Sequence, residues 1–171
     1  MEKMDKLQDE YPQLEFHYEK DMPNELSGFI LNKDIYINKQ NSKAKQLETL
    51  AEELGHYETT VGQIIPVKTE KDRIQERRAR RWGRMKIVTL RGLIDCYNSH
   101  LLTSEEVADF FEISVGYFWD AIADIKGKLG ERFMFDGYYF DLSCGLNIQK
   151  ITLSPNAENR KSCDITFRRC F

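Results

Sequence analysis

The chain reads Leu50-Ala51-Glu52-Glu53-Leu54-Gly55-His56 in its first third. This stretch differs at one position from the zinc-binding motif His-Glu-x-x-His, because Glu52 stands where the motif has its first histidine. Residues four apart lie on one face of an α-helix, since that spacing turns the helix about 40° beyond a full turn. The pattern therefore predicts a helix with Glu52 and His56 as a pair of metal ligands and Glu53 as the general base.

The residues around this motif are typical of an amphipathic helix. Asn41 or Ser42 can cap its N-terminus. Apolar residues then recur at the spacing of a buried helical stripe, namely Leu47, Leu50, Ala51 and Leu54. Glu52 and His56 project almost opposite this stripe. They belong either to a polar face exposed to solvent or to a cleft that another element covers.

Composition places the chain among ordinary globular proteins. Its 171 residues, 41% of them hydrophobic, suit one domain or one domain with a small appendage. A net charge of −3 argues against a protein that binds nucleic acid over its whole surface. We expect a cytoplasmic location, because there is neither a membrane-spanning apolar run nor a signal-peptide core. The four cysteines form no Cys-x-x-Cys pair, so reduced thiols are expected.

Short elements are predicted on the N-terminal side of the motif. Residues 3–10 are typical of a short helix, and residues 14–18 alternate apolar and polar as in a strand. Residues 28–31 and 35–37 are rich in β-branched and aromatic side chains and are separated by Asn32-Lys33-Asp34. This is the pattern of a β-hairpin that precedes the motif helix.

A longer helix is predicted from residue 71 to 97, with apolar positions that include Trp82 and Val88. Its first half, residues 71–86, holds eight lysines and arginines against Asp72 and Glu76. Such a run can bind phosphates, but it is more often a solvated face whose arginines pair with acidic neighbours. Charge alone leaves both interpretations open.

A helix-turn-helix pattern follows. Thr103-Ser104-Glu105-Glu106 is a capping box, and a second helix is predicted over residues 115–129. That second helix offers aromatic residues and aspartates where a DNA reader uses arginine, asparagine or glutamine. We therefore favour a packing role for the helical pair.

The C-terminal residues are predicted to form a strand pair. Residues 133–142 are rich in aromatic side chains and are interrupted at Asp136-Gly137, which is typical of a turn. Residues 155–171 are polar and basic with little periodicity, so we expect a loose tail.

Four segments of the chain, taken together, resemble a known family. They are Leu26-Ser27-Gly28-Phe29-Ile30, Asp34-Ile35-Tyr36-Ile37-Asn38, Leu50-Ala51-Glu52-Glu53-Leu54-Gly55-His56-Tyr57 and Gln75-Glu76-Arg77-Arg78-Ala79-Arg80-Arg81-Trp82. Their order and spacing resemble the ImmA/IrrE family of metallopeptidases. The resemblance continues through the helix-turn-helix-like segment to about Leu129, and the residues beyond it fall outside the pattern.

The resemblance implies a fold, a cofactor and a third ligand. The implied fold class is α+β, a zincin-like metallopeptidase domain with a small N-terminal β-hairpin or sheet, an active-site helix and a helix-turn-helix-like segment. In the family the second helix supplies an acidic zinc ligand, and Glu76 falls on its Glu-x-x-Ala signature. The implied ligand set for Zn²⁺ is therefore Glu52, His56 and Glu76, with Glu53 as the catalytic base.

The resemblance also implies a protein partner. Many relatives are encoded by phages or integrative mobile elements, and they cleave a helix-turn-helix repressor or cause its cleavage. A cognate repressor is thus the expected substrate, and nothing in the composition shows such a partner. From the charge balance and the absence of a long apolar run we expect no membrane partner and no direct binding to nucleic acid.

Glu52 in place of histidine changes the net charge of the predicted metal site. Two histidines and one carboxylate leave a zinc site near +1, which lowers the pKa of bound water towards about 7. Two carboxylates and a neutral histidine cancel the charge of the ion. Such a site is expected to activate water less strongly and to accept Mn²⁺ more readily.

These patterns lead us to expect a metallo-endopeptidase in which Glu53 takes a proton from the attacking water and passes it to the leaving amine. Tyr57 or an arginine of the second helix is a candidate to assist the oxyanion. The expected organisation is a core over residues 1–98, a helical segment over 99–130, and short strands with a loose tail over 131–171.

Two alternatives stay open: a degenerate module that binds a repressor without cleavage, and a DNA-binding regulator. His17 and His100 are expected to be surface or hydrogen-bonded residues rather than ligands.

Overall fold

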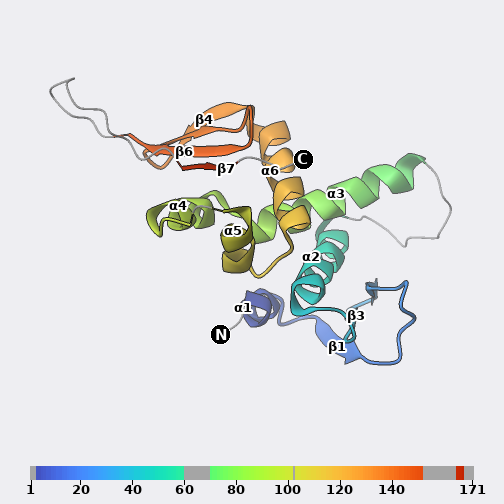
Figure 1. Cartoon of the computed structure of the whole chain (residues 1–171). Coiled ribbons are helices and arrows are strands. Elements are labelled where there is room, and N and C mark those ends of the chain that lie inside the picture. Colours follow the sequence, from blue (N-terminus) through green and yellow to red (C-terminus); the bar gives the residue numbers. More distant parts are fainter. Residues whose placement is uncertain (1–2, 60–69, 102, 152–164, 168–171) are drawn as a thin grey trace, which may run out of the picture.

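The computed structural model describes residues 3–59, 70–101, 103–151 and 165–167 (Figure 1). It is an α+β fold, as the sequence predicts. The helices of the described residues are α1 (Lys3–Asp9), α2 (Lys43–Thr59), α3 (Glu70–Ile87), α4 (Leu90–Asn98), α5 (Ser104–Phe111) and α6 (Val115–Leu129). The strands are β1 (Glu15–Glu19), β2 (Gly28–Leu31), β3 (Asp34–Asn38), β4 (Arg132–Phe135), β5 (Tyr138–Asp141), β6 (Leu146–Lys150) and β7 (Ile165–Phe167).

The N-terminal sheet has the order β1-β3-β2 and packs against α2. β2 and β3 form the predicted antiparallel hairpin, whereas β1 runs parallel to β3. The central strand β3 carries Ile35 and Ile37, which are fully buried. Because successive side chains of a strand alternate between its two faces, these two residues lie on the same face. They give the sheet its apolar contact with the rest of the core.

α2 confirms the predicted amphipathic helix. Of the two predicted caps, Ser42 Oγ accepts a hydrogen bond from the Lys45 N–H at 3.2 Å, which satisfies one unpaired donor of the first turn. All four residues of the predicted apolar stripe are buried, from Leu47 to Leu54. α3 covers part of the side of α2 that carries the motif, since Glu76 and Arg80 of α3 pair with His56 and Glu52.

The prediction of one helix from residue 71 to 97 is wrong, because the chain forms two helices there. α3 ends at Ile87 and α4 begins at Leu90. Thr89 between them is extended (φ −93°, ψ 152°), and its side chain accepts a hydrogen bond from the Gly92 N–H. Thr89 thus acts as the N-cap of a new helix, while Val88 beside it is buried in the core.

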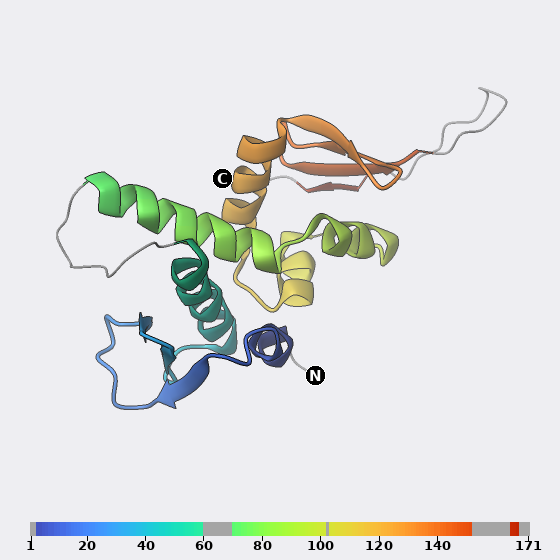
Figure 2. The ribbon, with the colours of Figure 1, turned by 180° about the vertical axis from the view of Figure 1, so that it is seen from behind.

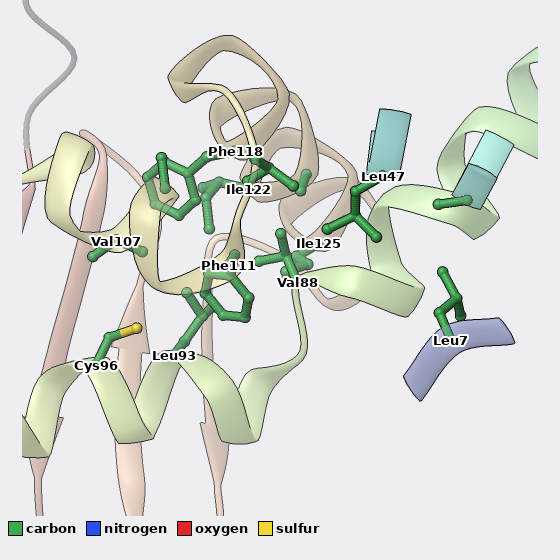
Figure 3. Packing of buried hydrophobic residues seen from close by; sticks show 14 of the residues in the cluster. Leu7, Leu47, Val88, Leu93, Cys96, Val107, Phe111, Phe118, Ile122 and Ile125 are labelled. Atoms are coloured by element: carbon green, nitrogen blue, oxygen red, sulfur yellow. The ribbon is translucent and has the colours of Figure 1, made fainter. Parts of the chain in front are cut away.

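α5 and α6 confirm the predicted helical pair and its packing role. Thr103 and Glu106 form both hydrogen bonds of the capping box. On α6, Phe118 and Ile122 are buried, and Figure 3 shows both in a cluster with Val107 and Phe111. One face of α6 is therefore part of the hydrophobic core, as a packing role requires.

The C-terminal strands form an antiparallel sheet of order β4-β5-β6-β7. β4 and β5 are joined by the predicted turn, in which Asp136 and Gly137 both have positive φ (50° and 79°) as two-residue hairpin turns require. β6 and β7 were not predicted. β7 lies within the tail that was expected to be loose, so that expectation is wrong for residues 165–167; the remainder of 155–171 lies outside the described residues.

α3 runs across the middle of the molecule, as two opposite views show (Figures 1 and 2). α2 and the N-terminal sheet lie on one side of it, and the C-terminal sheet lies on the other. A single buried cluster draws residues from α1, the first sheet, α2, α4, α5, α6 and the second sheet. The expected division of the chain into a core, a helical segment and a C-terminal part, with boundaries at residues 98 and 130, stays a prediction. Among the described helices, none combines the length and the apolar character that a bilayer crossing demands.

The capping box offers a direct test of the helical pair. Replacing Thr103 by alanine removes the side-chain acceptor of the Glu106 N–H. We expect the free energy of unfolding to fall by about 1 kcal/mol in urea denaturation. Ser104→Ala is the matched control, because the Ser104 hydroxyl contacts the exposed Glu105 carboxylate. Equal losses for both variants would show that the cap does not stabilise α5.

Candidate metal centre

α2 and α3 approach so closely that their backbones touch. A Cβ added to Gly55 would lie 2.2 Å from the Ala79 carbonyl oxygen, and one added to Gly83 would lie 2.6 Å from the Ala51 carbonyl oxygen. No side chain larger than hydrogen fits at either glycine without moving a helix. The two antiparallel contacts fix which residues of α2 and α3 face one another.

This approach brings the predicted ligands together from two helices. Glu52 and His56 lie on α2, and Glu76 lies on α3. One potential ligand atom from each of the three lies within 4.8 Å of those of the other two. His56 Nε2 lies 3.2 Å from Glu76 Oε2, and the His56 side chain is only 13% exposed. Of the two interpretations that the sequence left open, the structure favours the covered cleft.

Glu53 lies beside this cluster at the edge of the first sheet. Removal from water raises the pKa of its carboxyl group to about 7, and the negative charges of Glu52 and Glu76 act in the same direction. A hydrogen bond from the Ile30 backbone in β2 opposes them. A carboxyl group that titrates near neutrality can both accept and release a proton at physiological pH, as a general acid–base requires.

The sequence did not identify Arg80, which joins two of the three predicted ligands. Its Nε donates to Glu52 Oε1 at 2.8 Å, and its Nη2 lies 2.6 Å from Glu76 Oε1. The only local signal is its position four residues after Glu76 on α3. That spacing predicts a pair with Glu76 within α3 but carries no information about Glu52 on the other helix, so it could not reveal the bridge.

The other arginines of α3 support the prediction of pairing with acidic neighbours. Arg84 donates to Asp124 on α6 at 2.6 Å, and Arg81 lies 3.3 Å from the same carboxylate. Arg77 lies 3.8 Å from Glu70 at the start of α3. Arg81 and Arg84 thus hold α3 to α6, whereas Arg77 pairs within α3.

The remaining candidates lie elsewhere. His17 Nε2 lies 2.9 Å from Asp34 Oδ1, and its ring stacks on Tyr36, as expected for a hydrogen-bonded histidine. With Glu15 it forms a separate group that could hold an ion. His100 lies in a turn with φ 55°. Tyr57 is exposed, and its ring contacts Tyr11.

The donor set of the cluster fits a zinc-type cation. Imidazole nitrogen and carboxylate oxygen are zinc ligands, and two atoms that bind one tetrahedral ion lie about 3.4 Å apart. The 3.2 Å separation between His56 and Glu76 matches that value. His56 Nδ1 is buried and has no hydrogen-bond partner among the described residues, so the ring is not committed on that side.

A polar cavity of about 280 Å³ opens beside the cluster. It shares Glu52 with the cluster and is otherwise lined by Arg80 and further residues of α2, α3 and the start of α6. A second cavity, of about 290 Å³, lies between α1 and α4 and contains none of the predicted site residues. The space available to a substrate group next to the cluster is thus polar.

The α+β fold and the cluster of two carboxylates and an imidazole suit a metallopeptidase-type domain. Comparison with protein families matches residues 9–118, well over half of the chain, to Peptidase_M78, the IrrE N-terminal-like domain. The chain therefore belongs to this family of zinc-type peptidases, as the resemblance implied. No curated protein and no solved structure matches the chain significantly.

The helix contact that builds the cluster can be tested at Gly55. Gly55→Ala forces α2 and α3 apart, so we expect the free energy of unfolding to fall by about 1–3 kcal/mol. Affinity for Zn²⁺ should fall as well, because Glu76 moves away from His56. Gly127→Ala on α6 is the control, since its Cβ meets nothing within 4 Å and alanine favours a helix. A Gly55→Ala variant as stable as the unsubstituted protein would contradict the close contact.

Proposed function

We propose that this protein is a metallo-endopeptidase that cleaves a helix-turn-helix repressor of a phage or mobile element. Zn²⁺ is the proposed cofactor, and Mn²⁺ is a possible substitute because carboxylates suit it. The observation that carries the proposal is the cluster of Glu52, His56 and Glu76, whose ligand atoms lie within 4.8 Å of one another, in a chain of a zinc-type peptidase family.

The proposed roles follow from the positions of the side chains. Glu52, His56 and Glu76 would hold the ion, which when bound acts as a Lewis acid towards water and the substrate carbonyl. Glu53 is placed beside them and takes the proton of the attacking water. It then hands this proton to the leaving amine, for which a pKa near 7 is suitable.

The first sheet offers a place for an extended substrate. β2 is an edge strand, because β3 separates it from β1. The Ile30 backbone of β2 hydrogen-bonds Glu53, so this strand runs alongside the proposed base. Phe29 and Leu31 of the same strand are exposed. A peptide that added to β2 through backbone hydrogen bonds would pass next to Glu53.

A repressor as the substrate is supported by the family resemblance. A DNA-binding regulator is disfavoured, since α6 exposes Asp120 where a DNA reader uses arginine, asparagine or glutamine. One observation favours the alternative of a module that binds without cleaving. Arg80 pairs with both Glu52 and Glu76, so these carboxylates have a cationic partner within the protein itself.

Metal binding separates these alternatives. We expect Zn²⁺ or Mn²⁺ to raise the melting temperature of the protein, and EDTA to reverse the rise. A ligand at 100 times its dissociation constant stabilises a fold by about 2.7 kcal/mol. His56→Ala should abolish the effect, whereas His17→Ala, which alters the separate group near Asp34, should retain it. Loss of the effect only in His17→Ala would show that the ion binds the group of Glu15, His17 and Asp34 and not the proposed centre.

Catalysis is tested at Glu53. Glu53→Gln keeps the shape of the side chain but removes its ability to accept a proton. We expect cleavage of a cognate repressor, followed by mass spectrometry of the products, to fall by about 10²–10⁴-fold while Zn²⁺ affinity stays unchanged. Glu58→Gln is the control, because Glu58 is an exposed residue of α2 that interacts with Tyr11. Loss of bound metal in Glu53→Gln would mean that Glu53 has a structural role.

A further inference from the structure

The guanidinium group of Arg80 pairs with two carboxylates that come from different helices. Glu52 accepts from its Nε, and Glu76 pairs with its Nη2, at 2.8 and 2.6 Å. The guanidinium group is planar and presents several N–H donors in a fixed arrangement, which suits two acceptors at once. The Arg80 side chain is 52% exposed, so it covers the cluster from the solvent side without being part of the core.

Arg80 leaves each carboxylate with one oxygen that it does not bind. Glu76 uses Oε1 for Arg80, and its Oε2 faces His56 Nε2 at 3.2 Å. Glu52 uses Oε1 for Arg80 and retains Oε2. A free carboxylate can give an ion one oxygen or both. With Arg80 in place, Glu52 and Glu76 each have only one oxygen that Arg80 does not bind.

Arg80 also changes the charge of the cluster. A divalent ion with Glu52, Glu76 and neutral His56 sums to zero, and the guanidinium group raises the total to +1. This is the charge that two histidines and one carboxylate would give. The electrostatic effect of Glu52 in place of histidine is therefore offset by a residue on the neighbouring helix.

We propose that Arg80 is a positioning residue that restricts Glu52 and Glu76 to one metal-binding oxygen each and offsets the added negative charge of Glu52. The proposal rests on the proposed metal centre and goes beyond it in one respect. Arg80 keeps positions on the ion open for substrate and water, as a catalytic site requires, at the expense of metal affinity.

This role predicts an unusual direction of change. Removing an ordinary hydrogen-bonding partner of metal ligands lowers metal affinity by about 10–100-fold, because the ligands lose their orientation. Removing Arg80 should instead raise affinity, since a positive charge leaves and two carboxylate oxygens are freed. The gain should be larger for Mn²⁺ than for Zn²⁺, because Mn²⁺ prefers oxygen ligands.

The experiment measures Zn²⁺ and Mn²⁺ affinity of the purified full chain by competition with a chromophoric chelator. For Arg80→Met we expect Mn²⁺ affinity to rise roughly tenfold, and Zn²⁺ affinity to rise less. X-ray absorption at the manganese edge should show more oxygen ligands in this variant than in the unsubstituted protein. Arg80→Lys keeps the charge but cannot bridge both carboxylates in the same way, so its affinities should lie between the two.

Arg77→Met is the matched control. Arg77 lies on the same helix and pairs with Glu70, so its removal should leave both affinities unchanged. Circular dichroism and thermal melting establish that each variant is folded.

Unchanged or weaker metal binding in Arg80→Met would overturn the proposal. So would an equal rise for both ions with Arg80→Lys unchanged, because charge alone would then account for it. If the unsubstituted protein bound neither ion, this proposal and the proposed function would fail together. A fall in affinity confined to Arg80→Met would overturn this proposal alone.

Discussion

The structure depends on the contact between the backbones of α2 and α3. Gly55 faces Ala79 and Gly83 faces Ala51 at distances that exclude any larger side chain at either glycine. Larger residues would hold the helix axes further apart, and carboxylates and imidazole on facing rows would then no longer reach one another. The small residues at the contact let the two helices approach closely. This approach brings the carboxylates and the imidazole of the cluster within reach of one another.

Much of the fold could be predicted because its signals are local. The apolar stripe from Leu47 to Leu54 lies within one helix, and the capping box at Thr103 and the turn at Asp136-Gly137 each involve only a few consecutive residues. The parallel pairing of β1 with β3 has no such signal, since it joins strands separated by the whole of β2. The break at Thr89 was missed because apolar residues continue at helical spacing on both sides of it.

The residues of the candidate site also divide into those that local sequence predicts and those that depend on how the helices pack. Glu52, Glu53 and His56 follow from the spacing of one motif on one helix. Glu76 was predicted as a ligand only from the family signature, because the sequence of α3 does not indicate which helix α3 packs against. Arg80 was not found because its role is defined by two partners, one on each helix, and its sequence surroundings are full of other arginines. What sequence reasoning lacked was the relative position of α2 and α3.

The row of residues on α3 links the cluster to the C-terminal half of the chain. Glu76, Arg80 and Arg84 are spaced four apart, and Arg84 binds Asp124 of α6 in a largely buried ion pair. A one-residue twist of α3 turns every member of the row by about 100°. Such a twist would disengage Asp124 and dismantle the cluster in the same movement. The position of α6 therefore bears on the orientation of the row that carries Glu76 and Arg80.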